Sequence, residues 1–337
     1  MNPYAATACA SPNIALIKYW GNRDPSLRIP SNGSISMTLG GLECRTEVTF
    51  AADLSNDALF IDGQPTAGDA LQRVSAHLDL VRHLSRMQLR ARVDSWANFP
   101  AGAGLASSAA AFAALSLAAT TAAGLDLDPQ ALSRLARRGS GSACRSLHGG
   151  FVEWFAGRAD QESYAGPLVP ADHWDLVDLI ALVSHEPKAI GSSAGHALAS
   201  TSPLQDARVA DADRRLDICR RAILNRDFDA LAEITELDSN LMHAVMLTST
   251  PPLLYWLPAT VEVLQAVLSW RRQGIPICYT IDAGPNVHCL TTAEAAADAA
   301  HRLEDVPGVD RVLACPPGGP AHLAGTSVIP PASNPPG

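Results

Sequence analysis

The sequence predicts a globular protein of mixed strands and helices, built as two domains or as one large domain. Three observations support this prediction. Residues 7–63 contain short segments in which polar and apolar side chains alternate, as in half-buried strands. Residues 106–125 form an alanine-rich run that suits a buried helix, and residues 197–274 have mostly helical spacing. With 337 residues, the chain is long enough to bury a sizeable core.

The first hundred residues are expected to form a β-rich meander with one helix. The first strand starts at Thr7 and breaks at Gly21, since glycine weakens a strand. A helix is expected at 73–86, where apolar side chains recur with helical spacing. The further expected strands lie at 34–39, 44–50, 58–63 and 89–95.

A glycine-rich loop then runs into the alanine-rich helix. Gly102 and Gly104 permit backbone angles that other residues resist, and a helix start leaves N–H groups without partners, so the two together can cradle a phosphate. Ser107 and Ser108 can cap this helix, bind a phosphate oxygen or help to hold Mg²⁺. The loop matches neither the P-loop nor the dinucleotide pattern, and ordinary helix capping is the alternative interpretation.

The rest of the chain adds three more polar loops beside strands or helices. Asp128, as an N-cap before Pro129, opens a helix that ends at 138. The loop at 139–150 carries Arg145, and the loop at 184–196 carries Lys188. Asp282 follows an apolar strand and opens a tight turn. The expected strands lie at 151–154, 174–183, 276–281, 287–290 and 308–314, the expected helices at 211–225, 227–246, 257–274 and 294–303, and a frayed tail is expected from 316.

Composition and charge exclude several functions. The formal net charge of −9, with scattered basic residues, argues against a nucleic-acid partner. The N-terminus lacks a basic region followed by an apolar run, and the 106–125 run is too polar for lipid, so we expect a cytoplasmic protein without a membrane partner. The seven cysteines form no Cys-x-x-Cys pair, which predicts neither a disulfide framework nor a structural metal site.

Lysine is rare in this chain. Only Lys18 and Lys188 among the 25 basic residues are lysines. A compact ammonium can serve where the planar guanidinium of arginine cannot, so both are candidate functional residues, with chance retention as the alternative.

Together the four loops offer the ingredients of phosphoryl transfer. Lysines, an arginine, hydroxyls and backbone amides bind anions, while the single carboxylate of Asp282 can orient or deprotonate an attacking hydroxyl. An Asx turn is the structural alternative for Asp282 considered alone.

Several motifs in order along the chain resemble the diphosphomevalonate decarboxylase family of the GHMP kinase superfamily. They read Asn13-Ile-Ala-Leu-Ile-Lys18-Tyr19-Trp20-Gly21, Ser34-Ile-Ser36, Asn98-Phe99-Pro100 through Ala109, Gly139-Ser140-Gly141-Ser142-Ala-Cys-Arg145-Ser146 and Asp282-Ala-Gly-Pro-Asn286. The resemblance implies an α+β fold, with an N-terminal domain like ribosomal protein S5 domain 2 and a ferredoxin-like C-terminal domain. We expect an ATP-phosphate-binding domain at 1–175, a C-terminal GHMP-type domain at 176–325 and a flexible tail at 326–337. A homodimer is also implied.

The family's reaction supplies expected roles. ATP with Mg²⁺ phosphorylates the 3-hydroxyl of a 5-phosphorylated mevalonate, and loss of that phosphate with CO₂ leaves an isopentenyl ester. Asp282, Lys18 and Arg145 are the implied catalytic residues, with Arg145 also on the substrate carboxylate. The implied ATP-binding residues are Asn98, Pro100, Gly102, Gly104, Ser107 and Ser108, with Ser107 as a Mg²⁺ ligand, and residues 62–73 are a candidate adenine site. The implied substrate-binding residues are Tyr19, Trp20, Asn22, Ser140, Gly141, Ser142, Lys188 and Ser192.

Two departures from the family pattern bear on the substrate. Asn22 stands where the family has a second lysine, and Ser193 stands where bacterial members often have arginine. Both changes remove positive charge, so they favour mevalonate 5-phosphate as substrate and isopentenyl phosphate as product, as in the phosphomevalonate decarboxylase branch. Arg23 or Lys188 could restore the charge, which keeps mevalonate 5-diphosphate and isopentenyl diphosphate as the alternative. A mevalonate 3-kinase without decarboxylation and a non-catalytic binding protein are the remaining hypotheses.

Overall fold

A computed structural model describes residues 4–99, 107–186 and 190–325. Its N-terminal part is built on a six-stranded sheet with the order β16-β1-β6-β9-β7-β8. Residues along β6 alternate between buried and half-buried, as the polar–apolar alternation predicts. The strands are β1 (Ala5–Ala10), β6 (Cys44–Ala51), β7 (Ala58–Ile61), β8 (Gln64–Thr66), β9 (Arg90–Ala97) and β16 (His322–Leu323).

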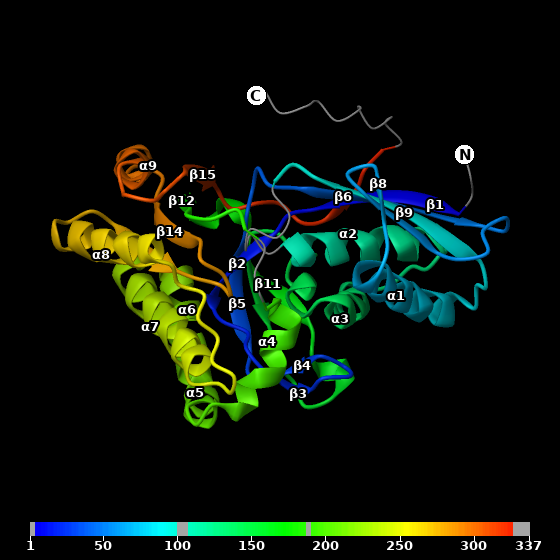
Figure 1. Cartoon of the computed structure of the whole chain (residues 1–337), viewed down its shortest axis with the longest axis horizontal. Coiled ribbons are helices and arrows are strands. Elements are labelled where there is room, and N and C mark those ends of the chain that lie inside the picture. The colour runs from blue at the N-terminus through cyan, green and yellow to red at the C-terminus, as the bar shows by residue number, and fades with distance from the viewer. Residues whose placement is uncertain (1–3, 100–106, 187–189, 326–337) are drawn as a thin grey trace.

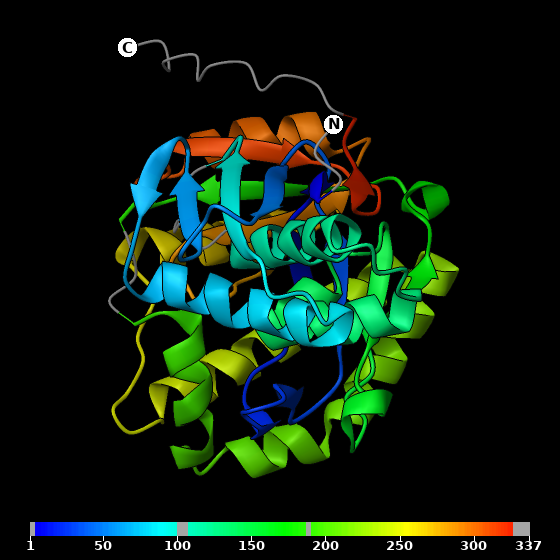
Figure 2. The same cartoon turned by 90° about the vertical axis from the view of Figure 1, so that its right-hand side faces the viewer.

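Helix α2 (Ser107–Ala122) packs beneath this sheet. Small alanine side chains let the helix lie close to β1 and β6, and the helix is buried around most of its circumference. Figure 2 shows α2 between the sheet and the outer helices α1 (Asp69–Ser85) and α3 (Pro129–Gly139). The Asp128 carboxylate caps α3 by accepting from the Ala131 N–H at 2.8 Å, as the sequence predicts.

A second sheet occupies the centre of the molecule (Figure 1). Its order is β11-β10-β5-β2, and β2 (Asn13–Ile17), β5 (Ser34–Thr38) and β10 (Phe151–Trp154) are buried throughout. The edge strand β11 (Ala165–Val169) was not anticipated from the sequence. Helices α6 (Ala212–Asn225) and α7 (Phe228–Leu247) pack against this sheet, so one hydrophobic core continues from the N-terminal half into the C-terminal half.

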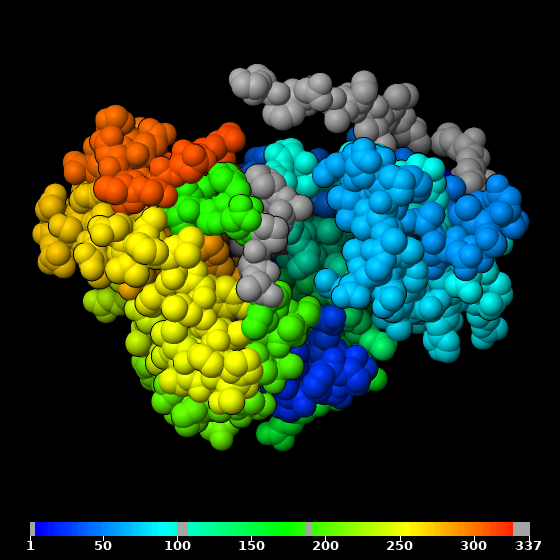
Figure 3. Space-filling model, viewed as in Figure 1, coloured from blue at the N-terminus to red at the C-terminus, as the bar shows by residue number. Residues whose placement is uncertain are grey.

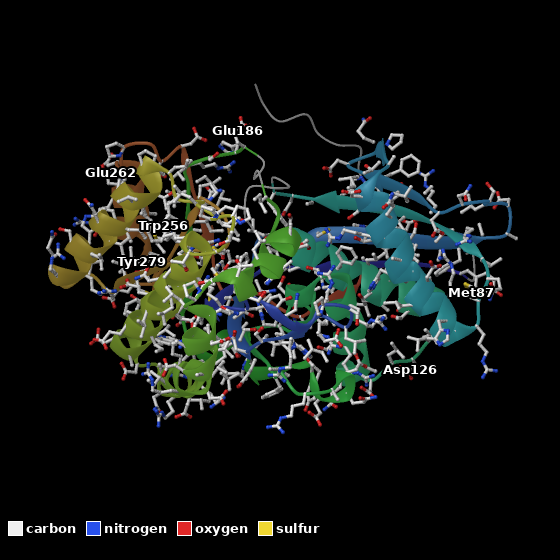
Figure 4. All side chains as sticks on the ribbon, turned by 60° about the horizontal axis from the view of Figure 1, so that its bottom comes forward. Met87, Asp126, Glu186, Trp256, Glu262 and Tyr279 are labelled. Atoms are coloured by element: carbon white, nitrogen blue, oxygen red, sulfur yellow. The ribbon has the colours of Figure 1, made fainter. Side chains whose placement is uncertain are left out.

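The C-terminal half contains a third sheet with the order β13-β14-β12-β15. Its strands are β12 (Leu176–Leu182), β13 (Ile277–Thr280), β14 (Val287–Thr292) and β15 (Arg311–Cys315). Helices α7, α8 (Pro258–Arg272) and α9 (Ala296–Glu304) cover it. Figure 4 shows Trp256 and Tyr279 in this half, far from Met87 and Asp126 at the other end of the molecule.

Two short pairs of elements lie between the halves. The hairpin β3 (Asn22–Asp24) with β4 (Ile29–Pro30) follows Gly21, which has a positive φ of 89°. Helices α4 (Ser192–Leu198) and α5 (Gln205–Ala210) occupy a stretch whose first part was expected to be loop.

The expected fraying from residue 316 is wrong for the described part of that segment. Gly40 donates to the Pro316 carbonyl at 2.7 Å, and Gly318 donates to the Thr38 carbonyl at 2.7 Å. The chain then reaches the first sheet, where His322 and Leu323 pair with Cys9 and Ala8 of β1. Backbone pairing therefore holds a proline- and glycine-rich segment whose composition alone suggested a free end. The expected flexible tail at 326–337 lies outside the described residues.

All seven cysteines are buried and free, which agrees with reduced core cysteines. Among the described residues, no helix combines the length and apolar character needed to cross a bilayer.

Candidate active site

Lys18 and Asp282 form an ion pair at the ends of two buried strands. Lys18 follows β2 and Asp282 lies just beyond β13, although the two residues are 264 positions apart in sequence. Lys18 Nζ lies 2.6 Å from Asp282 Oδ1, and the side chains are 1% and 28% exposed respectively. The ammonium is therefore enclosed, while the carboxylate remains accessible.

Burial and pairing act in opposite directions on these charges. Burial alone would raise the pKa of the Asp282 carboxyl, but nearby positive charge, chiefly that of Lys18, outweighs it and holds the pKa below its ordinary value of 3.8. Burial lowers the pKa of Lys18, and the charges of Asp282 and Asp238 oppose that effect without cancelling it. At neutral pH Asp282 is therefore an ionised acceptor.

A buried ion network holds the main chain of Lys18. The Asp238 carboxylate of α7 accepts from Lys18 N and from Arg215 Nε, each at 2.6 Å. Arg208 donates to the Lys18 carbonyl at 2.8 Å. Asp238 and Arg215 are fully buried, and removing either would leave a charge without compensation. The lysine is thus positioned through its backbone as well as through its ammonium.

Arg145 enters the same site from the loop after α3. Its guanidinium donates to Asn13 Oδ1 from Nε and Nη2, at 3.2 and 3.1 Å, and to the Ser34 hydroxyl. Only 2% of the residue is exposed, and it forms no ion pair within the described part of the chain. Neutral partners orient this cation and leave its charge available to a bound anion.

These groups line one cavity of about 100 Å³, which we call the central cavity. Residues of both halves line it. Figure 3 shows that the surface is recessed over α2, between the blue and cyan part of the molecule and the green and yellow part. Ten of the residues predicted for the site line it: Lys18, Tyr19, Trp20, Ser108, Ser140, Gly141, Ser142, Arg145, Ser192 and Asp282.

Tyr19 is held between two rings at the edge of the central cavity. Its ring lies edge-on to Trp154, at 4.7 Å between centroids, and stacks on His196 at 4.1 Å. The Gly21 N–H donates to His196 Nδ1 at 3.0 Å, and burial lowers the pKa of His196 to about 3. The imidazole is therefore neutral and adds no positive charge.

A second, apolar cavity of about 210 Å³ lies on the other side of the start of α2. Leu59, Val74 and Phe112 contribute to its walls, with Asp62 and Arg73 among its polar lining residues. Ser108 lines both this apolar cavity and the central cavity, and its hydroxyl lies 3.2 Å from that of Ser140. The apolar cavity and the central cavity, which is rich in cations and hydroxyls, therefore lie on either side of the first turn of α2.

Two family models match most of this chain. The model of the diphosphomevalonate decarboxylase-like N-terminal domain matches residues 10–165, and that of the mevalonate 5-diphosphate decarboxylase C-terminal domain matches residues 178–312. The chain belongs to the diphosphomevalonate decarboxylase family. The diphosphomevalonate decarboxylase of Candida albicans is 39% identical over 300 residues, which cover 84% of this chain and 83% of that protein.

Solved structures of the decarboxylase family share the fold. Mevalonate diphosphate decarboxylase from Staphylococcus aureus has a TM-score of 0.91 and 36% identity, covering 95% of this chain and 98% of that one. MDDEF in complex with MVAPP, AMPPCP and magnesium has a TM-score of 0.90 and 36% identity, covering 96% and 99%. The expected α+β fold of the GHMP kinase type is confirmed.

Other predicted decarboxylase residues lie apart from the central cavity. Asn98 donates to the Gly41 carbonyl and accepts from Glu43 N, and it lines neither the central nor the apolar cavity. Ser107 lines the apolar cavity. Asn22 accepts from the Tyr19 hydroxyl at 2.5 Å, beside the central cavity. Pro100, Gly102, Gly104 and Lys188 lie outside the described residues.

Sequence reasoning missed several residues of this decarboxylase site. Asp238 lies on an amphipathic helix, where an acidic residue normally faces solvent. Asn13 and Ser34 open two of the family motifs at the starts of β2 and β5, but they were not assigned to the site. Arg28 and His196 also line the central cavity. His196 ends the polar loop expected at 184–196, but neither residue was singled out as a site residue. Only their packing against distant segments identifies them.

The close contact between Gly141 and Tyr19 gives a testable prediction. A Cβ at position 141 would lie 2.5 Å from the Tyr19 ring, which Trp154 and His196 prevent from moving away. We expect Gly141→Ala to lower the free energy of unfolding in urea by about 1–3 kcal/mol and to raise the KM of the phosphorylated substrate. Gly166→Ala is the control, since its nearest contact would be an ordinary 3.8 Å. Equal effects from both variants would contradict the role of this contact.

Proposed function

We propose that the protein catalyses ATP-dependent decarboxylation of mevalonate 5-diphosphate to isopentenyl diphosphate in the mevalonate route to isoprenoids. Lys18, Asp282 and Arg145 line one cavity in a chain of this family, and this observation supports the proposal most strongly. The described relatives are named diphosphomevalonate decarboxylases, which favours the diphosphate over the monophosphate that the charge argument preferred. Positions 22 and 193 lack charge, but Arg28 lines the same space.

In the first step, the substrate 3-hydroxyl faces Asp282. The hydroxyl oxygen forms a bond to the γ-phosphorus of ATP, the bond from that phosphorus to the bridging oxygen breaks, and ADP leaves. The Asp282 carboxylate accepts the hydroxyl proton, and Lys18 stabilises negative charge on the transferring group. Because the pKa of Asp282 is low, its main contribution is to orient the hydroxyl until the new bond is largely formed.

In the second step, the 3-phosphate leaves with the electron pair of the C3–O bond. The electrons of the bond between the carboxylate carbon and C2 then form the C2–C3 double bond, and CO₂ departs. Arg145, fixed by Asn13 and Ser34, holds the carboxylate so that this bond aligns with the breaking C3–O bond. No further proton transfer is needed.

The apolar cavity suits the adenine of ATP. It lies next to Ser107 and Ser108 at the start of α2, where N–H groups and the helix dipole favour phosphates. Mg²⁺ usually takes few protein ligands and completes its coordination shell with phosphate oxygens and water. The central cavity, whose lining has more hydroxyls than carboxylates, fits this kind of coordination. Ser107 is our candidate ligand, and the ion would neutralise phosphate charge during transfer.

Product analysis tests the function. With ATP and Mg²⁺, mevalonate 5-diphosphate is expected to yield ADP, phosphate, CO₂ and isopentenyl diphosphate in equal amounts. The kcat/KM is expected to be about tenfold or more above that of mevalonate 5-phosphate, as one lost charge-assisted contact implies. ADP formation without CO₂ would identify a 3-kinase instead, and a preference for the monophosphate would overturn the substrate assignment.

We further propose a cytoplasmic homodimer. The family resemblance supports the homodimer, and the composition supports the cytoplasmic location. Light scattering of the purified chain tests the oligomeric state. A monomer at assay concentration would contradict it.

A further inference from the structure

Arg28 lies where the central cavity meets a larger space beside it. This hairpin cavity, of about 610 Å³, is lined by residues of the β3–β4 hairpin and of helices α4 and α5. Arg28, Ser193 and His196 line both cavities. A charge at Arg28 therefore acts on anything that extends from the central cavity toward the hairpin.

Within the described residues, Arg28 is the one lysine or arginine lining these two cavities that has no hydrogen-bond or ion-pair partner. Lys18 is paired with Asp282, and Arg145 is held by Asn13 and Ser34. Arg23 donates to the Gly157 carbonyl at 2.8 Å and is exposed. Arg28, by contrast, is half-buried without compensation, a state that a bound anion would relieve.

The turn that carries Arg28 has a defined backbone conformation. Its φ of 51° lies in the left-handed region, which non-glycine residues rarely adopt. The preceding turn is held by the Asp24 carboxylate, which accepts from Ser26 N at 2.8 Å and Leu27 N at 3.0 Å. Arg137 Nε, from α3, donates to the Leu27 carbonyl at 3.0 Å. The hairpin thus holds this residue against the cavities.

The neighbouring groups respond to the charge of Arg28. Burial is the first cause of the low pKa of His196, and the guanidinium of Arg28 is the second. Burial raises the pKa of the Tyr19 hydroxyl, and Arg28 opposes that rise. Asn22 and Ser193, the two positions that lack the charge usual in the family, lie in the same space and are neutral. The hairpin cavity has two cations among its described lining residues, Arg23 and Arg28, and one carboxylate, Asp206, and of these only Arg28 also lines the central cavity.

We infer that Arg28 binds the terminal phosphate of the substrate diphosphate and supplies the positive charge that positions 22 and 193 lack. This inference rests on the proposed function, since it takes the substrate to be a diphosphate ester. Tyr19, Ser140 and Ser192 hold the inner phosphate in the central cavity, and the planar guanidinium of Arg28 meets the outer one at the junction.

Kinetics of Arg28→Gln test the inference. We expect KM for mevalonate 5-diphosphate to rise about 10- to 100-fold, with KM for ATP and kcat nearly unchanged, because one charge-assisted contact is lost. Arg28→Lys should lose less. Adding Asn22→Lys to Arg28→Gln should recover part of the loss, since it places an ammonium in the same space. Arg158→Gln is the matched control, because Arg158 is exposed near this hairpin and lines neither cavity.

A binding measurement separates this inference from the proposed function. Inorganic pyrophosphate is expected to raise the Tm of the wild-type chain and of Arg158→Gln, and to raise that of Arg28→Gln much less. If the wild type decarboxylates the diphosphate ester while Arg28→Gln keeps its KM and its pyrophosphate shift, Arg28 does not bind this phosphate. A rise in KM for ATP alone would assign Arg28 to the nucleotide and overturn the inference. If the wild type turns over neither ester, the proposed function fails, and the pyrophosphate shift still reports on Arg28.

Discussion

Asp282→Asn is expected to lower kcat by about 10²–10⁴-fold, while KM for both substrates changes little. The amide keeps the shape of the carboxylate, but it cannot accept the hydroxyl proton and offers Lys18 a much weaker partner. Because the side chain is accessible and already ionised at neutral pH, the wild type needs no rearrangement to receive the substrate hydroxyl. The loss should therefore appear in the chemical step, which single-turnover measurement of ADP formation isolates.

Asp298→Asn provides the comparison. Asp298 forms an exposed pair with Arg302 on the surface of α9 and lines neither the central nor the hairpin cavity, so its loss should leave kcat unchanged. Circular dichroism and Tm of both variants would show whether the fold is retained. Unchanged turnover in Asp282→Asn would remove the carboxylate from the mechanism and revive the hypothesis of a non-catalytic binding protein.

Lys18→Met should have the next largest effect, again with a loss of about 10²-fold or more in kcat. Methionine fills a similar volume but removes the charge beside the transferring phosphate. It also removes the main factor that lowers the pKa of Asp282, whereas burial, which raises that pKa, remains. In the wild type the carboxyl protonates only below its ordinary 3.8, so activity near neutrality is insensitive to it. In Lys18→Met the pKa is higher, and activity should fall as pH decreases through that higher value.

The pH profile distinguishes this effect from a simple loss of structure. Lys18→Arg retains the positive charge but replaces the compact ammonium with a planar guanidinium. It should therefore lose activity, while the pH at which activity falls on the acidic side should change little. An acidic limb at the same pH in all three proteins would show that Lys18 does not control the ionisation of Asp282.

The proposed catalytic residues were recognisable in the sequence from their positions and their motifs. Lys18 and Asp282 each follow a buried apolar strand closely, a position that alone also allowed chance retention of the lysine and an Asx turn, and it was the resemblance of their motifs to the decarboxylase family that implied catalytic roles. The serine- and glycine-rich turns were recognisable for a similar reason, since their composition suits anion binding. Periodicity also gave most helices and strands close to their observed bounds.

Residues that act through distant packing could not be predicted in this way. The helical pattern around Asp238 does not reveal that its carboxylate faces Lys18 and Arg215 in the core. Arg28 lies in a short turn whose importance comes from its backbone angle and from two neighbouring cavities. The return of residues 316–323 depends on backbone pairing with β1 and its surroundings, which composition does not encode.

That return has a mechanical consequence. The polypeptide passes between the halves once from β11 to β12 and again from β15 to β16, and the second passage is bonded along its length to residues 38–40. Two separated attachments leave rotation only about the line that joins them, and a large rotation of that kind would have to open the hydrophobic core that β2 and β5 share with α6 and α7. Such an opening would expose apolar surface to water, so we expect ligands to bind with little change in the relative position of the halves.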